Sequence, residues 1–244
     1  SVGAAMAEVE VGVAKVAATD HPVLLLGENG TGKELVAHEV HRLSGRLGPF
    51  LALNCASLSG ERLERALFGP LTPTPATLPM PDPTRDVTSS SAGLWRDGDA
   101  SKDPQDALLL RAQSGTVFLD EVGEMDEAVQ RRLLHLLQTG SFTPTGESAE
   151  VRVTTRIIAA TNREVDAFGG SEHMLPELYA FLSERAVKLP ALRERKEDLG
   201  VLVRVLLGRR AAGLDVTPDL MAALLSAHWP LNIRGLVDVL KTAR

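Results

Sequence analysis

A glycine-rich turn between an apolar strand and a helix constrains this chain more than any other feature of its sequence. The run Pro22–Leu26 is apolar on both faces, as a buried parallel strand is, and the sequence GENGTGKE follows it at residues 27–34. Glycines in such a turn let backbone N–H groups curl around a phosphate, and the following helix adds a favourable dipole. The pattern predicts a phosphate-binding loop in which Lys33 reaches the terminal phosphates of a nucleotide.

The residues that we expect to hold the nucleotide in this turn are Gly27, Glu28, Asn29, Gly30, Thr31, Gly32, Lys33 and Glu34. One of them departs from the usual phosphate-loop pattern. Glu34 stands where a Ser or Thr hydroxyl normally contacts magnesium. Magnesium must then be held mainly by another carboxylate and by water.

A second apolar run ends in two acids that can supply that carboxylate. The run Thr116–Leu119 leads directly into Asp120 and Glu121. An acid pair at a strand end is commonly just solvated, but after a phosphate-binding loop it predicts a magnesium ligand, Asp120, and a base that polarises the attacking water, Glu121. Asn54 and Asn162 end two further strands, and Asn162 could contact the γ-phosphate or the water. For both asparagines a simple turn cap is the competing interpretation.

Strands and helices alternate through most of the chain and predict an α/β fold with a parallel sheet covered by helices on both sides. The expected strands are Pro22–Leu26, Phe50–Leu53, Thr116–Leu119, Arg156–Ala160 and Ala186–Leu189, and the expected helices include Glu34–Leu43 and Glu127–Gln138. After Pro190 only helical patterns follow, at Leu199–Arg210, Pro218–Ala227 and Asn232–Thr242. We therefore expect an α/β nucleotide-binding domain over residues 1–189 and a small helical domain over residues 190–244. Residues 70–107, rich in Pro and Ser, are expected to form an irregular insertion.

Composition excludes several classes of protein. The net charge of −6 argues against a broadly basic surface for nucleic acid. No run of eighteen apolar residues and no signal peptide is visible, and the single Cys55 fits a reducing compartment, so we expect a cytoplasmic protein without a membrane partner. The six histidines show no metal-ligand spacing with Cys55, which leaves magnesium as the only metal that we expect. The chain begins and ends abruptly, so we expect it to be part of a longer protein.

Five longer motifs resemble one family. They are GENGTGKELVA at 27–37, LNCASL at 53–58, GTVFLDEVGEM at 115–125, RIIAATNRE at 156–164 and LPALRERKEDL at 189–199. Together they resemble the central AAA+ domain of bacterial enhancer-binding proteins, the activators of sigma-54 RNA polymerase. The sequence HWPLNIRGL at 228–236 resembles the lid motif of that family, where WPGNVREL is usual.

This resemblance implies a P-loop ATPase core with a helical lid, and ATP or ADP with Mg²⁺ as ligands. It also implies assembly with further copies into a hexamer-like ring with the nucleotide at subunit interfaces. Arg234 matches the sensor arginine that reaches the nucleotide from the lid, and Asn54 matches the asparagine that restrains the catalytic glutamate. Family members contact DNA through a separate domain, which these residues do not include.

Two departures from the family pattern shape the functional hypothesis. The family carries a GAFTGA loop that grips sigma-54 after its ELFG motif, but here Ala66–Gly69 leads into the Pro-rich insertion and no GAFTGA occurs. The family also carries two arginines that act on a neighbour's ATP, and Leu175 and Phe181 stand in their places. We therefore expect a regulator that binds ATP, hydrolyses it weakly or not at all, and lacks the usual sigma-54 contact. Arg163 or Arg185 could replace the missing arginines from a shifted position.

Three alternatives compete with this hypothesis. The first is a working ring-forming ATPase that remodels the sigma-54 holoenzyme or another target. The second is a non-enzymatic interaction module that acts through residues 70–107. The third, a P-loop kinase of small molecules, fails to explain the lid motif or the LRERKEDL stretch.

Overall fold

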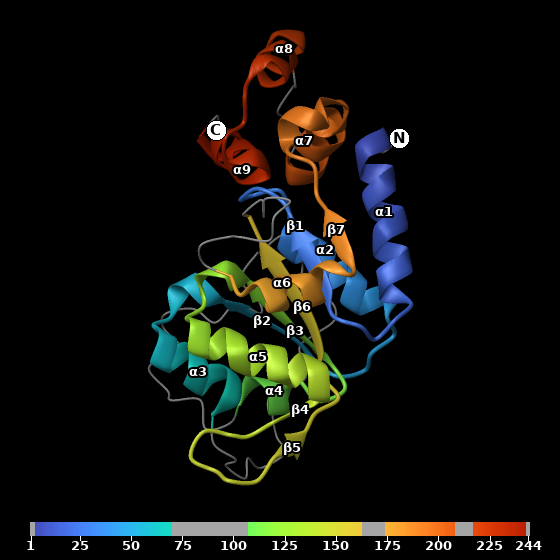
Figure 1. Ribbon diagram of the computed structural model, residues 1–244. Helices are drawn as coiled ribbons and strands as arrows, with labels where there is room; N and C mark the ends of the chain where they lie inside the picture. The colour runs from blue at the N-terminus through green and yellow to red at the C-terminus, as the bar shows by residue number, and fades with distance from the viewer. Residues whose placement is uncertain (1–2, 70–106, 163–173, 208–216, 243–244) are drawn as a thin grey trace.

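The computed structural model describes residues 3–69, 107–162, 174–207 and 217–242 of the chain (Figure 1). Its centre is a five-stranded sheet in the order β2-β3-β6-β1-β7, and every neighbouring pair is parallel. The strands are β1 Val23–Leu26, β2 Phe50–Asn54, β3 Thr116–Asp120, β6 Arg156–Thr161 and β7 Ala186–Lys188. The predicted α/β class and all five predicted strands are therefore confirmed, with ends that agree to within a residue.

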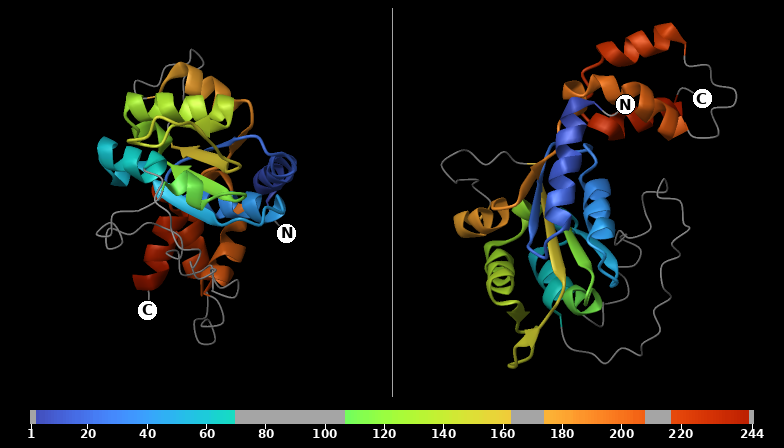
Figure 2. Two further views of the ribbon diagram at one scale, coloured as in Figure 1. Left: turned by 90° about the horizontal axis from the view of Figure 1, so that it is seen from below. Right: turned by 90° about the vertical axis from the view of Figure 1, so that its right-hand side faces the viewer.

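Helices cover both faces of this sheet (Figure 2). On one face lie α1 Ala4–Ala17 and α2 Lys33–Leu43, and on the other α3 Gly60–Phe68, α4 Leu108–Arg111, α5 Glu127–Thr139 and α6 Pro176–Ser183. Successive side chains of a strand point to opposite faces of the sheet, so β1 contributes to the cores on both faces. Val23 and Leu25 pack with α1 and α2, whereas Leu24 packs with the helices on the other face. All three are fully buried, which explains why an uninterrupted apolar run was a reliable strand signal.

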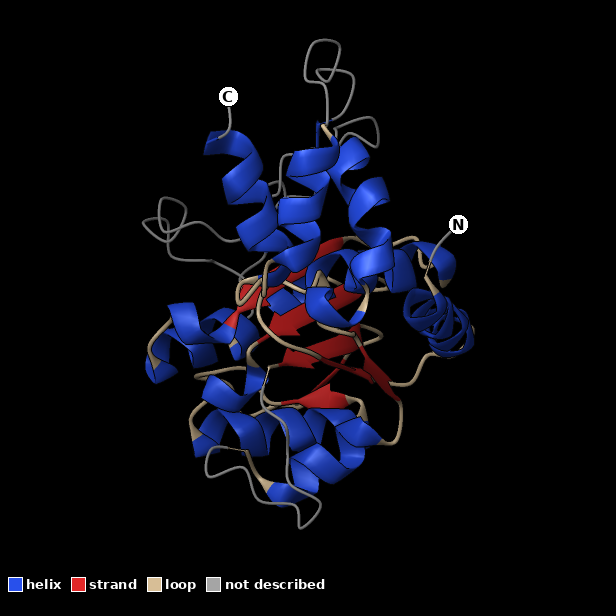
Figure 3. Ribbon diagram, turned by 90° about the horizontal axis from the view of Figure 1, so that it is seen from above, coloured by secondary structure: helices blue, strands red, loops and turns tan. Residues whose placement is uncertain are grey.

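Three further helices enclose a core of their own. These are α7 Leu199–Leu207, α8 Pro218–Ser226 and α9 Asn232–Thr242, grouped above the sheet in Figures 1 and 3. Buried residues of these helices, such as Leu199 and Leu236, form with Trp229 from the segment between α8 and α9 a cluster separate from the two sheet layers. The Thr217 hydroxyl accepts a hydrogen bond from the Leu220 N–H and caps the start of α8, and Pro218 occupies the first turn of that helix.

The remaining described elements are short. An antiparallel pair joins β4 Ser141–Phe142 to β5 Val151–Arg152, and four 3₁₀ turns lie at Cys55–Ser57, Val122–Glu124, Leu192–Glu194 and Lys196–Asp198. The predicted irregular insertion lies outside the described residues except for Ala107, which is buried. In the part of the chain that the structure describes, no helix is both long and apolar enough to cross a membrane.

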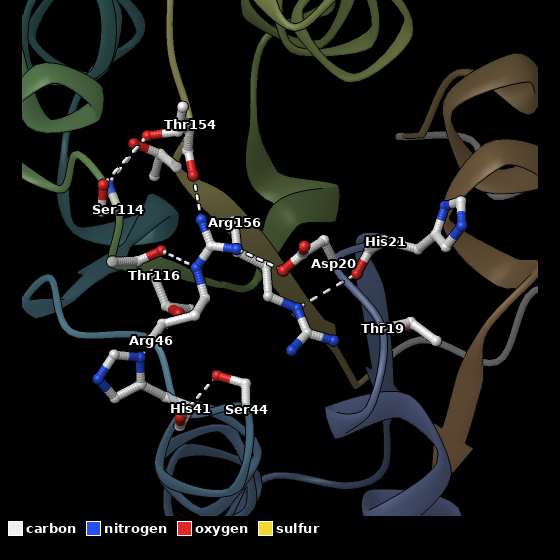
Figure 4. A network of polar contacts seen from close by, with 12 residues as sticks. Thr19, Asp20, His21, His41, Ser44, Arg46, Ser114, Thr116, Thr154 and Arg156 are labelled. Carbon is white, nitrogen blue, oxygen red and sulfur yellow. Dashed lines mark hydrogen bonds and ion pairs between the residues drawn. The ribbon is translucent and has the colours of Figure 1, made fainter.

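Two arginines, Arg46 and Arg156, form hydrogen bonds at the edge of the sheet where the strands begin (Figure 4). Arg156 begins β6 and is almost fully buried, and it donates hydrogen bonds to the carbonyls of His21 (3.2 Å) and Val16 (2.6 Å). Arg46 pairs with Asp20 at 2.5 Å and donates to the carbonyls at Gly115 (2.9 Å) and Thr154. These bonds join α1 and the loop after α2 to the strand starts, and they leave the carboxyl edge free for a ligand.

Candidate nucleotide-binding site

The polar residues predicted from sequence meet at the carboxyl edge of the sheet. The glycine-rich turn follows β1, Asn54 ends β2, Asp120 ends β3, and Asn162 follows β6. Because all neighbouring strands are parallel, these ends lie on the same side, and Asn54 and Asp120 are direct register partners. The carboxyl edge of an open parallel sheet is where such folds bind ligands. The structure thus brings together residues from four separate motifs.

The turn after β1 has the backbone shape that a phosphate cradle requires. Gly30 and Gly32 adopt φ values of 79° and 102°, which residues with a Cβ rarely reach. Lys33 opens α2 and is only 6% exposed, and its Nζ donates to the carbonyls of Gly27 (2.8 Å) and Glu28 (3.2 Å). Burial lowers the pKa of this ammonium, an effect that the nearby Asp120 and Glu121 oppose. The cation of Lys33 is therefore held inside the turn, where phosphate oxygens could replace the carbonyls.

Three carboxyl groups face this turn from two elements. Burial raises the pKa of Asp120, although the Lys33 cation pulls it the other way. Burial and the proximity of Asp120 also raise the pKa of Glu34. Glu121 follows in a left-handed conformation with φ 57° and ψ 47°, unusual for a non-glycine residue and typical of strained functional positions. Burial partly desolvates the carboxyl groups of Asp120 and Glu34, and carboxylate oxygens are ligands that a hard cation such as Mg²⁺ prefers.

The two predicted asparagines differ in what they contact. Asn54 Oδ1 accepts a hydrogen bond from the Ala56 N–H at 2.9 Å and so caps the 3₁₀ turn Cys55–Ser57. No hydrogen bond joins Asn54 to Glu121 within the described residues, so the restraining role stays a prediction. Asn162 is exposed at the end of β6, beside the buried Thr161 whose carbonyl accepts from the Gly27 N–H at 3.3 Å.

The start of α9 lies directly on the phosphate-binding turn. The Ile233 N–H donates to the Gly30 carbonyl at 2.9 Å. A Cβ built on Gly30 would lie 2.3 Å from the Leu231 carbonyl and 3.2 Å from the Cβ of Arg234, so only glycine fits there. The exposed Arg234 adds positive charge that is felt at Lys33 and at Asp120. The predicted sensor arginine therefore faces the site from the lid side.

Two residues that sequence analysis missed complete this contact. The Glu28 carboxylate accepts two hydrogen bonds from the guanidinium of Arg193, at 2.8 and 2.5 Å, and a third from Asn232 Nδ2 at 3.1 Å. These bonds lower the pKa of Glu28 to about 2. Arg193 lies in the LRERKEDL stretch and Asn232 in the lid motif. The sequence indicated both motifs, but it did not predict that these two residues contact Glu28.

The lowered pKa of Glu28 predicts a dependence of stability on pH. The folded-state pKa lies below the ordinary value of 4.5, so the stabilisation is complete above about pH 5 and is lost as pH falls toward 2. The Glu28 and Arg193 side chains are 41% and 46% exposed, which limits the effect to roughly 1 kcal/mol or less. The difference in melting temperature between the wild type and Glu28→Gln should therefore shrink steadily as pH falls below about 5 toward 2. A difference that stays constant over that range would contradict the assignment.

The positions where the family's trans-acting arginines were expected are partly buried. Leu175 packs against the core beside α5, and its N–H donates to Oε1 of the buried Gln130 at 2.7 Å. Phe181 is half-buried on α6. Of the two proposed substitutes, Arg163 lies outside the described residues, and Arg185 has a buried Nε without a hydrogen-bond partner in the described part of the chain.

Similar proteins are found by comparison with family models, with known sequences and with solved structures. A family model described as the Sigma-54 interaction domain matches residues 2–72 and 97–188. The Nif-specific regulatory protein of Rhodobacter capsulatus is 36% identical over 98% of this chain and 38% of its own length, and the regulatory protein AtoC of Escherichia coli K12 is 35% identical over 98% and 48%. The crystal structure of NtrX from Brucella abortus in complex with ATP aligns with a TM-score of 0.77 at 29% identity, over 98% of this chain and 50% of that one. The chain thus spans half or less of the length of these relatives.

Proposed function

Because the chain belongs to the Sigma-54 interaction domain family, we propose that it is the ATP-binding AAA+ domain of a sigma-54 activator-like transcriptional regulator. The observation that carries this proposal is the meeting of Lys33, Asp120 and Arg234 around one glycine-rich turn. In this proposal residues 1–189 hold the nucleotide, and residues 190–244 act as a lid over it.

ATP or ADP is the proposed ligand of the turn. Backbone N–H groups of residues 27–32 would surround the phosphates, with Lys33 and Arg234 neutralising their charge from two sides. A related protein, NtrX from Brucella abortus, has been crystallised with ATP and with ADP. In this chain the buried Lys33 ammonium of the half-buried turn would pair with a polyphosphate.

Magnesium is the proposed metal. Asp120 would hold it, with Glu34 close by in place of the usual hydroxyl, and phosphate oxygens and water would complete its coordination. No group of three or more metal-ligating side chains occurs among the described residues. Bound magnesium would neutralise charge on the transferring phosphoryl group. Glu121 would orient water beside it, and Asn54 and Asn162 would position Glu121 and the water.

We propose further that this domain hydrolyses ATP slowly or not at all. An arginine supplied by a neighbouring subunit is worth about 10³–10⁵ in turnover. Leu175 and Phe181 carry no charge; Leu175 packs against the core of its own subunit, and Phe181 is half-buried on α6. Nucleotide would then serve as a regulatory ligand that closes the lid and tunes assembly of a hexamer-like ring.

The absence of the GAFTGA sequence predicts that the usual contact with sigma-54 is missing. In a sigma-54 promoter reporter strain, the full-length protein is expected to activate transcription no more than its Lys33→Ala variant does. Both proteins should be detected at equal levels by immunoblot. Robust activation that depends on Lys33 would contradict this part of the proposal and would favour a working motor. DNA contact would come from a domain outside this chain.

A further inference from the structure

The start of helix α9 is tied to the phosphate-binding turn by one side chain, Asn232. Its Nδ2 donates to Glu28 Oε2 at 3.1 Å and to the Asn29 carbonyl at 2.9 Å. Its Oδ1 accepts from the Leu192 N–H at 2.7 Å. This one amide therefore joins the turn, the segment that enters the lid, and α9. We call this set of hydrogen bonds, together with the bond from Ile233 to Gly30, the Asn232 clasp.

The backbone of Asn232 is adapted to this task. The residue is completely buried and adopts φ 51°, a left-handed conformation that asparagine tolerates better than most residues. A buried amide must have its donors and acceptor satisfied, and here each finds a backbone or carboxylate partner. Its burial, its backbone conformation and its hydrogen bonds therefore all fit a specific role for Asn232 at this position.

A second feature supports the same connection. The Ile233 N–H belongs to the first turn of α9, where amide groups have no partner within the helix. The Gly30 carbonyl supplies that partner at 2.9 Å. The missing Cβ of Gly30 is what allows this approach, because a Cβ would lie 2.3 Å from the Leu231 carbonyl. The lid thus meets the turn through backbone atoms, and Arg234 follows within the same helical turn.

We propose that Asn232 is a positioning residue: it holds the phosphate-binding turn and the lid together before nucleotide arrives, and so keeps Arg234 beside the phosphate site. The inference rests on the proposed nucleotide-binding function for its effect on affinity. The clasp itself is a property of the nucleotide-free protein. When the clasp is lost, only a fraction of molecules would hold the binding-competent arrangement, and the apparent affinity would fall by that fraction.

Hydrogen exchange at Ile233 reports on the clasp directly, because the partner of this amide in the described part of the chain is the Gly30 carbonyl. Asn232→Gly keeps the left-handed backbone without strain but removes the amide. We expect it to speed exchange at Ile233 and to weaken Mg-ADP binding roughly tenfold. Asp238→Asn, on the exposed face of the same helix, is the matched control and should change neither. Exchange in α8 should stay as in the wild type, which separates a lost clasp from an unfolded lid.

A rescue experiment separates positioning from simple packing. Asn232→Asp would place a carboxylate against the carboxylate of Glu28, and we expect it to weaken Mg-ADP binding more than Asn232→Gly does. Adding Glu28→Gln offers an amide donor from the other side, so the double variant should bind better than Asn232→Asp alone. Independent losses that simply add would overturn the proposal.

The outcomes distinguish this inference from the proposed function. Unchanged Ile233 exchange and unchanged ADP affinity in Asn232→Gly would overturn the clasp, while the nucleotide site would stand. Faster exchange at Ile233 in a protein whose wild type binds no nucleotide would support the clasp and refute the proposed function. Faster exchange throughout the lid would assign Asn232 to lid folding and would also overturn the positioning role.

Discussion

Phe181→Arg is expected to raise steady-state ATP turnover by about 10³-fold, provided that the protein assembles with its neighbours. That increase corresponds to about 4 kcal/mol of transition-state stabilisation. The position is half-buried on α6, whereas Leu175 is packed against the core and bonded through its backbone to Gln130. Phe181→Arg should therefore fold more readily than Leu175→Arg, and it is the variant to make first.

The measurement is phosphate release at protein concentrations high enough for assembly, with the melting temperature as a check on folding. Phe181→Lys provides the control, because it adds the same charge without the planar fork of a guanidinium. It should give a much smaller increase. A folded, assembled and ATP-binding Phe181→Arg protein with unchanged turnover would show that the absent arginine is not what limits hydrolysis.

Lys33→Ala is expected to weaken Mg-ATP binding by roughly 100-fold, or about 3 kcal/mol. The Lys33 ammonium is buried inside the turn and donates hydrogen bonds to the carbonyls of Gly27 and Glu28. Without it, the phosphates would face the carboxyl groups of Asp120, Glu121 and Glu34 with less positive charge to oppose them.

Isothermal titration calorimetry with Mg-ATP measures this loss. Lys15→Ala, a change in the last turn of α1, is the matched control and should bind as the wild type does. Equal affinity of the wild type and Lys33→Ala would place the nucleotide elsewhere or exclude it. Loss of folding is checked by the melting temperature, since the removed ammonium also bonds two carbonyls of the turn.

Much of the fold could be predicted because strands buried on both faces leave a plain signal. Pro22–Leu26 reads as a strand since helices cover both of its sides, and the phosphate-binding turn follows it with a fixed spacing. The helix α1 was not predicted. Its sequence alternates Val9, Val11 and Val13 like a strand, whereas the residues that it buries on the sheet side, Val9, Val13 and Val16, have helical spacing.

For the site as well, some residues could be predicted from the sequence and others could not. Lys33 and Asp120 could be named because each lies in a motif whose spacing carries chemistry, and Arg234 could be named because the lid motif resembles that of a known family. The Asn232 clasp could not be named, since its partners are 40 or more residues distant in sequence and its left-handed backbone follows from docking on Gly30. For Asn54 the sequence indicated the residue but not its contact. The residue type allowed either a turn cap or a contact with Glu121, and the structure contains the cap.

The central claim is that this domain binds ATP through its own residues and lacks the parts that a neighbour would use to drive hydrolysis. The most direct test measures ATP binding and steady-state turnover on the same sample over a wide range of protein concentration. The account predicts binding that depends on Lys33, with negligible turnover per subunit at every concentration. Turnover per subunit that climbs with concentration would contradict it, because another arginine would then act across a subunit interface and the domain would be a working motor.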